Sequence, residues 1–387
     1  MTRGSVGEVA RLFLKLGFIG FGGPAAHIAL MREETVRRRR WLDDQEFLDM
    51  LGAASIIPGP SSTELGIYLG LRRAGFWGLL AAGACFIGPA LLIVLGLAWL
   101  YVRYGQAPGG QEALYGIKPV VVAIILQALW ALGRTAVKGP PFGVLGLAAA
   151  AAYLGGANPV AVLAACSVLV MLGERLWRDS RHDGSAAEGR PRQQLFFVPG
   201  PAVLAGAAAG AGKASLGALF LVFLKIGSIV FGSGYVLLVF LRGELVTGPG
   251  WLTDQQLLDA VAVGQFTPGP VFTTATFIGY LVAGLPGALV STAGVFLPAF
   301  VLIPVIDRVL EQVKTSPWVR GALDGINLAA LGLMAGVSLQ LGRAAISDPL
   351  TLAIGVAATA AAFSGRINPA WLILGGAAIG LAKLALP

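Results

Sequence analysis

The chain has 387 residues, of which 56% are hydrophobic and only 12% are charged, and its formal net charge is +8. A soluble domain carries about twice this fraction of charged residues. The stretches 74–102, 139–173 and 271–306 contain no Asp, Glu, Lys or Arg, and each is longer than the roughly 20 residues that a membrane helix needs. The sequence therefore predicts an all-α polytopic membrane protein and excludes a soluble fold.

Residue types that serve metal binding and catalysis are scarce. Two cysteines inside apolar runs and two histidines exclude a disulfide framework, a CxxC site and a His-based metal centre. We therefore expect no metal, no cofactor and no enzymatic activity. The basic residues flank apolar runs, which is typical of topology control rather than of nucleic-acid binding. We expect no nucleic acid as a partner.

In chain order, each half of the sequence contains six apolar segments. Those of the first half lie at about 8–30, 46–71, 75–102, 113–134, 141–157 and 159–174. Those of the second half lie at about 214–241, 256–281, 285–307, 322–343, 350–364 and 368–386. A weaker apolar run at 195–212 can supply one further span.

The two halves are homologous. Residues 13–60 align with 223–270 without a gap and share 19 identities in 48 positions, whereas composition alone gives about one in ten. Further along the chain the offset changes from 210 to 209. We divide the chain into an N-terminal repeat at 1–173, a polar, Arg-rich cytoplasmic linker at 174–194 and a C-terminal repeat at 195–387.

The charge flanks predict opposite orientations for the two repeats. Arg37–Arg40 and Arg72–Arg73 lie on both sides of the second segment, and basic flanks favour the cytoplasm. A segment with both ends on one side must turn back, and Pro58-Gly59-Pro60 lies at its middle. In the second half the basic residues move to the loop at 308–320. Inverted repeats with discontinuous or re-entrant helices are typical of secondary transporters, whose substrate site lies near the midplane.

The breaks in the helices are the candidate anion sites. A helix that begins after Pro-Gly-Pro presents unpaired backbone N–H groups and the positive end of its dipole, which together attract anions. Hydroxyl side chains and glycine-rich breaks add donors, and one lysine in each half adds positive charge. The candidate substrate-binding residues are Lys15, Gly22, Gly23, Pro58, Gly59, Pro60, Ser61, Ser62, Thr63, Lys225, Gly232, Ser233, Gly234, Pro268, Gly269, Pro270, Thr273 and Thr274.

Each candidate also has a simpler interpretation. Glycines in membrane helices often serve close packing, and Lys15 can extend its amine to the membrane surface. Glu64 has no equivalent in the second half and is either a proton-coupling carboxylate or the partner of a nearby arginine. His27 is interpreted as structural. Helix N-terminal capping explains Asp44, Asp49, Asp254 and Asp259, and turns or caps explain Asn158 and Asn368.

The ordered set of motifs resembles the chromate ion transporter (CHR) family in its long two-domain form. The set comprises Phe-Gly-Gly-Pro at 21–24, Trp-Leu-x-Asp-x-x-Phe at 41–47 and Pro-Gly-Pro at 58–60, with copies in the second half. The copies are imperfect, since the second half reads Phe-Gly-Ser-Gly at 231–234 and has Leu257 where the first has Phe47. The two halves therefore need not contribute equally to a site.

The resemblance implies a multi-pass protein of the bacterial inner membrane that exports chromate and confers chromate resistance. We expect alternating access, with one half or bundle rocking against the other around the breaks. Residue types do not separate chromate from sulfate, so a carrier of sulfate or another tetrahedral oxyanion and an anion channel are the alternatives. The lipid bilayer is an expected partner, and a homo-oligomer is compatible with the sequence.

Overall fold

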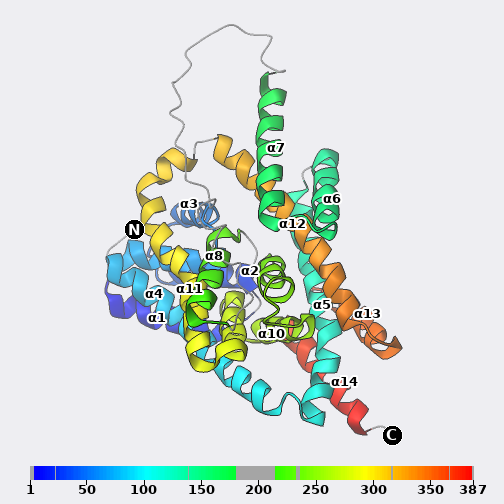
Figure 1. The fold of residues 1–387 in the computed structure, drawn as a ribbon. Coiled ribbons are helices and arrows are strands. Elements are labelled where there is room, and N and C mark those ends of the chain that lie inside the picture. The colour runs from blue at the N-terminus through cyan, green and yellow to red at the C-terminus, as the bar shows by residue number, and fades with distance from the viewer. Residues whose placement is uncertain are drawn as a thin grey trace.

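The computed structural model describes residues 4–21, 23–137, 139–179, 214–231, 236–314, 317–365 and 367–385, and these form helices joined by short connections (Figure 1). The first half contains α1 (Val6–Ile19), α2 (Gly23–Arg32), η1 (Glu33–Arg38), α3 (Asp44–Ala54), α4 (Ser61–Tyr104), α5 (Pro108–Ala136), α6 (Pro140–Leu154) and α7 (Pro159–Asp179). The second half contains α8 (Leu216–Ile229), α9 (Leu237–Leu241), η3 (Arg242–Thr247), α10 (Asp254–Phe266), η4 (Val271–Thr273), α11 (Thr274–Lys314), α12 (Pro317–Ala345), α13 (Pro349–Phe363) and α14 (Pro369–Ala385).

The order of elements confirms the sequence repeat. The pairs α1/α8, α5/α12 and α6/α13 contain 14, 29 and 15 residues in both halves. The predicted discontinuities are also confirmed, because α1 ends before the glycine-rich motif and α3 ends before the first Pro-Gly-Pro. The weak apolar run at 195–212 lies outside the described residues.

Four of the described helices are long and apolar enough to cross a membrane. They are Ser61–Tyr104, Pro108–Arg134, Val271–Val309 and Gly321–Ala345, which are the bodies of α4, α5, α11 and α12. Large apolar side chains on α4 point outward, with Trp77 68% and Leu92 67% exposed. The chain is a multi-pass membrane protein whose two halves supply equivalent spans.

The long helices α4 and α11 are each bent sharply near their first third. Gly75 and Gly284 adopt φ +64° and +63°, a left-handed backbone that favours glycine. A Cβ at Gly70 would overlap the carbonyl of Gly78, although residues eight apart in a straight helix are separated by about 12 Å. Each helix therefore consists of a short first part that follows Pro-Gly-Pro and a long spanning part.

The helices of the two halves interlock. Within a half, α1 packs on α4 and α8 packs on α11, and α4 meets α11 between the halves. In contrast, α5 of the first half packs against α13 and α14 of the second, and α12 of the second packs against α6 and α7 of the first (Figure 1). Glycines permit close approach at these contacts, with Gly116 of α5 against Gly376 of α14 and Gly325 of α12 against Cys166 and Ser167 of α7.

Helix starts follow the expected capping chemistry, with one adjustment. The N-caps of α3 and α10 are Asp43 and Thr253, each in a capping box. The following residues, Asp44 and Asp254, are first-turn residues and not the caps themselves. They pair with Arg32 at 2.7 Å and with Arg242 at 2.8 Å.

The prediction that an asparagine precedes and caps α7 and α14 is confirmed. The side chain of Asn158 accepts a hydrogen bond from the backbone N–H of Val160, and that of Asn368 accepts one from Ala370, both at 2.9 Å. A side-chain acceptor satisfies an N–H group that has no partner within the helix. The two asparagines thus serve the same end of equivalent helices.

Candidate functional site

The helix breaks of the two halves cross each other. The backbone N–H of Gly59 donates to the carbonyl of Val230 at 2.6 Å, and the N–H of Gly269 donates to the carbonyl of Gly20 at 2.8 Å. Gly59 and Gly269 are equivalent in the repeat, as are Gly20 and Val230. Each Pro-Gly-Pro is therefore bound to the end of α1 or α8 of the other half, and four breaks meet at one junction, which we call the crossing.

The backbone at the crossing depends on glycine. Gly59 and Gly269 have φ +138° and +94°, which a side chain disfavours. A Cβ at Gly59 would overlap Oε1 of Glu64, and one at Gly269 would lie 2.9 Å from Cβ of Ala90. Proline on either side removes backbone donors and ends the preceding helix. The conformation that allows the exchange of hydrogen bonds thus follows directly from Pro-Gly-Pro.

His27 joins three parts of the crossing. Its Nε2 lies 2.9 Å from the carbonyl oxygen of Gly20, and its Nδ1 lies 3.1 Å from Oγ of Ser62. Because a carbonyl only accepts, Nε2 carries the proton, and Nδ1 of the neutral ring accepts from the Ser62 hydroxyl. The side chain is 2% exposed. His27 is therefore a buried bridge between the end of α1 and the first turn of α4, as the structural interpretation predicted.

Glu64 lies beside Gly59, and its carboxyl group has no hydrogen-bond partner among the described residues. The residue is fully buried, and neither carboxylate oxygen has a hydrogen-bond partner within the described ranges. The neighbouring Thr63 hydroxyl is also buried without a partner there. Of the two sequence interpretations of Glu64, pairing with an arginine is not seen among the described residues in this conformation. The first turn of α4 therefore contains one hydroxyl and one carboxyl whose hydrogen-bonding capacity is unused.

The corresponding turn of the second half is internally satisfied. Thr273 donates to the carbonyl of Pro270 at 2.8 Å, and Thr274 donates to that of Val271 at 2.7 Å. Here the repeat is one residue shorter, and η4 begins the helix as a 3₁₀ turn. A 3₁₀ turn rises about 0.5 Å more per residue than an α-helix, so three residues recover the length of the missing one. The missing residue explains why Glu64 has no equivalent.

The two lysines singled out in the sequence are ion-paired. Nζ of Lys15 lies 2.6 Å from Glu34, and Nζ of Lys225 lies 2.7 Å from Glu244. These carboxylates occupy equivalent positions in the π-helical turns η1 and η3. The hydrogen bond from Lys15 holds the pKa of Glu34 below its ordinary value. In this conformation the lysine charges are balanced by carboxylates and are not directed to the crossing.

Four of the predicted site residues, Gly22, Gly232, Ser233 and Gly234, lie outside the described residues. Gly23 is described and begins α2 with φ +77°. Ser61, Ser62 and Thr63 form the first turn of α4, and Ser62 is the residue that bonds to His27. Three or more His, Cys, Asp or Glu side chains do not come together as a metal site in the part of the chain that the structure describes.

A buried ion pair outside the crossing escaped the sequence analysis. Lys118 of α5 lies 3.5 Å from Oδ1 of Asp259 in α10, and the Tyr101 hydroxyl donates to Oδ2 at 2.9 Å. Asp259 is 2% exposed, so the prediction that it is a capping residue is wrong. Lys118 was the available signal, because it is the one charge in the interior of the apolar run 113–134, which ends at Arg134. Charged residues within membrane spans are costly and usually paired.

Comparison with known proteins identifies similar chains. A family model described as "Chromate transporter" matches residues 7–171 and 217–381. A probable chromate transport protein of Synechococcus elongatus is 34% identical over 381 residues, which cover 97% of this chain and 94% of that protein. Chromate transport proteins of Cupriavidus metallidurans and Pseudomonas aeruginosa are 32% and 30% identical, over 98% and 94% of this chain and 93% and 88% of theirs. No solved structure matches the chain.

Proposed function

This chain belongs to the chromate transporter family, and on that premise we propose that it exports chromate across the bacterial inner membrane through a site at the crossing. Relatives named as chromate transport proteins match both halves and the linker between them. The junction of four helix breaks is the observation that carries the proposal. Broken helices near the midplane, at the interface of inverted repeats, are where secondary transporters bind substrate.

The proposed anion ligands are backbone N–H groups at the start of α4 and α11, together with hydroxyls of the first turn of α4. Helix N-termini favour anions because their first N–H groups lack intrahelical acceptors. In the first half, Thr63 offers a buried hydroxyl that is not yet used. Lys15 and Lys225 belong to this site only in a state in which they leave Glu34 and Glu244. The glycine-rich segments at 22–23 and 232–234 complete the proposed set of anion ligands.

Glu64 is the proposed coupling residue. A carboxylate at the first turn of α4 repels a dianion bound there, and its buried charge has no cation to offset it. Protonation of Glu64 removes both costs. We therefore expect chromate to bind together with a proton on Glu64. A dianion that leaves a negative-inside cell gains about 4.6 kcal/mol per 100 mV. The membrane potential alone can therefore drive chromate export, whichever way the proton moves.

The packing between the two halves limits which groups of helices can move as rigid units. The sequence suggested that one half or bundle rocks against the other, and in the structure α5 packs against α13 and α14, and α12 packs against α6 and α7. A rigid motion of whole halves has to break both contacts. We propose instead that the helices around the crossing move against two mixed bundles, α5/α13/α14 and α12/α6/α7.

Chromate uptake into everted vesicles tests the function. Respiration makes such vesicles positive inside, so an exporter accumulates chromate in them, and sulfate is added as competitor. We expect saturable uptake that is collapsed by an uncoupler. Absence of uptake contradicts export, equal competition by sulfate favours a general oxyanion carrier, and rates that do not saturate favour a channel.

Two pairs of variants test the site. Thr63→Val removes the unused hydroxyl, and Thr274→Val is its matched control because that hydroxyl bonds to its own helix. We expect only Thr63→Val to raise the KM for chromate. Glu64→Gln mimics the protonated carboxyl, so we expect uptake that no longer responds to an imposed pH gradient. An unchanged pH response removes Glu64 from coupling while leaving the anion site untouched.

A further inference from the structure

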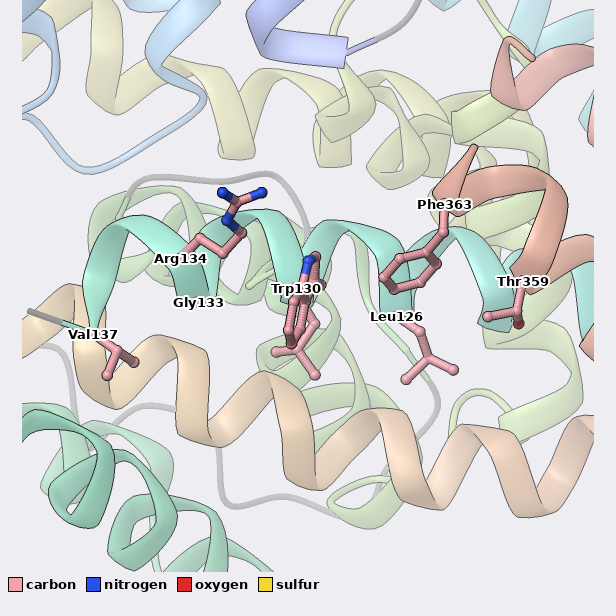
Figure 2. Close-up of a pocket in the computed structure, with 8 residues that line it drawn as sticks. Leu126, Trp130, Gly133, Arg134, Val137, Thr359 and Phe363 are labelled. Carbon is pink, nitrogen blue, oxygen red and sulfur yellow. The ribbon is translucent and has the colours of Figure 1, made fainter. Parts of the chain in front are cut away.

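An open groove runs between the carboxyl-terminal parts of α5 and α13. Its volume is about 640 Å³, and its lining is apolar except for Thr359 and Arg134. Figure 2 shows Trp130 and Leu126 on α5 facing the same side, with Phe363 of α13 directed toward Trp130. The two rings lie 6.3 Å apart between centroids, and Trp130 is 61% exposed. The groove thus opens on the surface that faces lipid.

Arg134 lies at one end of this groove. It is in the last turn of α5, one turn beyond Trp130, and its guanidinium extends away from the aromatic rings (Figure 2). Other arginines of the chain, such as Arg32, Arg72 and Arg242, pair with aspartates. No acidic side chain in the described ranges pairs with Arg134. The guanidinium is therefore available to a ligand from outside the described residues.

The location of the groove relative to the membrane indicates which ligand it binds. The arginines at 37–40 and 72–73 indicate that the spanning part of α4 starts at the cytoplasmic side, so α5 returns there and Arg134 lies at that surface. The groove extends from Arg134 toward Leu126, which is deeper in the membrane. We propose that it binds one phospholipid with an anionic headgroup, whose acyl chain lies along Trp130 and Phe363 and whose phosphate contacts Arg134. The cytoplasmic leaflet is where anionic lipids concentrate, and basic pockets between helices bind their headgroups.

The aromatic ring that is equivalent to Phe363 in the other half is packed against protein. Tyr153 of α6 corresponds to Phe363, and it is 9% exposed and lies against Gly336 of α12. Arg343 of α12 corresponds to Arg134. Because the inverted repeat places Arg343 at the opposite membrane surface, the two arginines form a matched pair in which only Arg134 faces the anionic leaflet.

Quenching of Trp130 fluorescence by brominated lipids tests the site. The full chain is reconstituted in phosphatidylcholine vesicles with increasing fractions of phosphatidylglycerol brominated on its acyl chains, or of brominated phosphatidylcholine. The Trp130 signal is the difference between the wild type and Trp130→Phe. We expect half-quenching at an about fivefold lower fraction of phosphatidylglycerol, since one arginine near the headgroups contributes about 1 kcal/mol.

Three further variants decide the outcome. Arg134→Gln is expected to abolish the preference for phosphatidylglycerol, whereas Arg343→Gln is expected to retain it. Thr359→Phe fills the groove and is expected to reduce quenching by both lipids. Equal quenching by the two lipids in the wild type, or a preference that persists in Arg134→Gln, indicates ordinary contact with bulk lipid and overturns the proposal. The readout does not involve transport, so it is independent of the proposed substrate.

Discussion

The helices α3 and α10 precede the two Pro-Gly-Pro motifs and are equivalent in the repeat, yet they have different neighbours. One face of α3 is open, with Leu48 52% exposed, and the helix packs mainly on α4 and α11. In contrast, α10 is buried from Leu257 to Ala262 and contacts α5, α11, α12 and α14. The equivalent aspartates differ accordingly, since Asp49 accepts from Gln45 within α3 and Asp259 is ion-paired to Lys118 on α5.

The two halves therefore differ in how the helix before Pro-Gly-Pro is attached to its neighbours. An ion pair with Lys118 attaches α10 to a mixed bundle, whereas the hydrogen bond described for Asp49 is with Gln45 on its own helix. The unused hydroxyl and carboxyl at the crossing, Thr63 and Glu64, follow α3 and not α10. Under the proposed function, we therefore expect α3 and the first turn of α4 to move and bind the anion, and α10 to stay fixed to its neighbours.

The largest expected effect is on the second-half anchor. Asp259→Ala leaves Lys118 without its partner and is expected to lower the free energy of unfolding by about 3 kcal/mol. Asp49→Ala, its equivalent, is expected to change it by less than about 0.5 kcal/mol. Thermal unfolding in detergent measures both. Equal effects contradict the comparison, and the double variant Asp259→Ala/Lys118→Met is expected to recover most of the loss.

The next effect separates the two glycines of the crossing. Gly59→Ala and Gly269→Ala both force a side chain into a left-handed backbone, at a cost of about 1–3 kcal/mol each. At Gly59 the obstacle is the end of the Glu64 side chain, which can rotate, whereas at Gly269 it is Cβ of Ala90, which cannot. We expect Gly269→Ala to unfold at the lower temperature. The reverse order argues against a rigid second half.

His27→Leu makes the first half resemble the second, which has Leu237 at this position. The change removes the contacts to Gly20 and Ser62, and each lost hydrogen bond between uncharged groups contributes about 1 kcal/mol. We expect a moderate loss of stability and a larger loss of chromate uptake, because the first turn of α4 loses its link to α1. Unchanged uptake limits His27 to a role in folding.

The smallest effects concern the exposed ion pairs. Lys225 and Glu244 are 18% and 21% exposed, whereas the Lys15 side chain is 46% exposed, so Lys225→Ala should cost more than Lys15→Ala, with both below about 1 kcal/mol. The depressed pKa of Glu34 stabilises the fold above the ordinary carboxyl pKa of 4.5, and this contribution is lost as pH falls through the folded-state value. Unfolding temperatures measured between pH 6 and pH 3 should fall less steeply in Lys15→Ala.

Local backbone chemistry made the breaks predictable from the sequence. Proline and glycine restrict or release particular backbone angles wherever they occur, so Pro58-Gly59-Pro60 and its copy end helices without help from distant contacts. The ion pairs Lys15–Glu34 and Lys225–Glu244 also left a signal, because both partners are retained at the same offset in the repeat. Of each pair, only the lysine was predicted as a site residue, and its glutamate partner was not.

Contacts between distant segments were not predictable. The bonds from Gly59 to Val230 and from Gly269 to Gly20 join backbone groups, which every residue carries, so residue types do not reveal them. Lys118 and Asp259 are 141 residues apart, and Lys118 corresponds to Asn327 in the repeat. The exchange of terminal helices between the halves depends on packing that only the assembled chain defines.

That exchange has a consequence for how the protein is made. The helix α5 ends at residue 136 and α13 begins at residue 349, and α13 and α14 pack more extensively on α5 than α10 and α12 do, so 212 residues must be synthesised before the first of these two helices starts to appear. At about 5–20 residues per second this takes roughly 10–40 s, during which α5 lies in the bilayer without α13 and α14. A nascent chain cut short before α13 leaves its first half unfinished, and biosynthesis completes both halves together only when the last helices emerge.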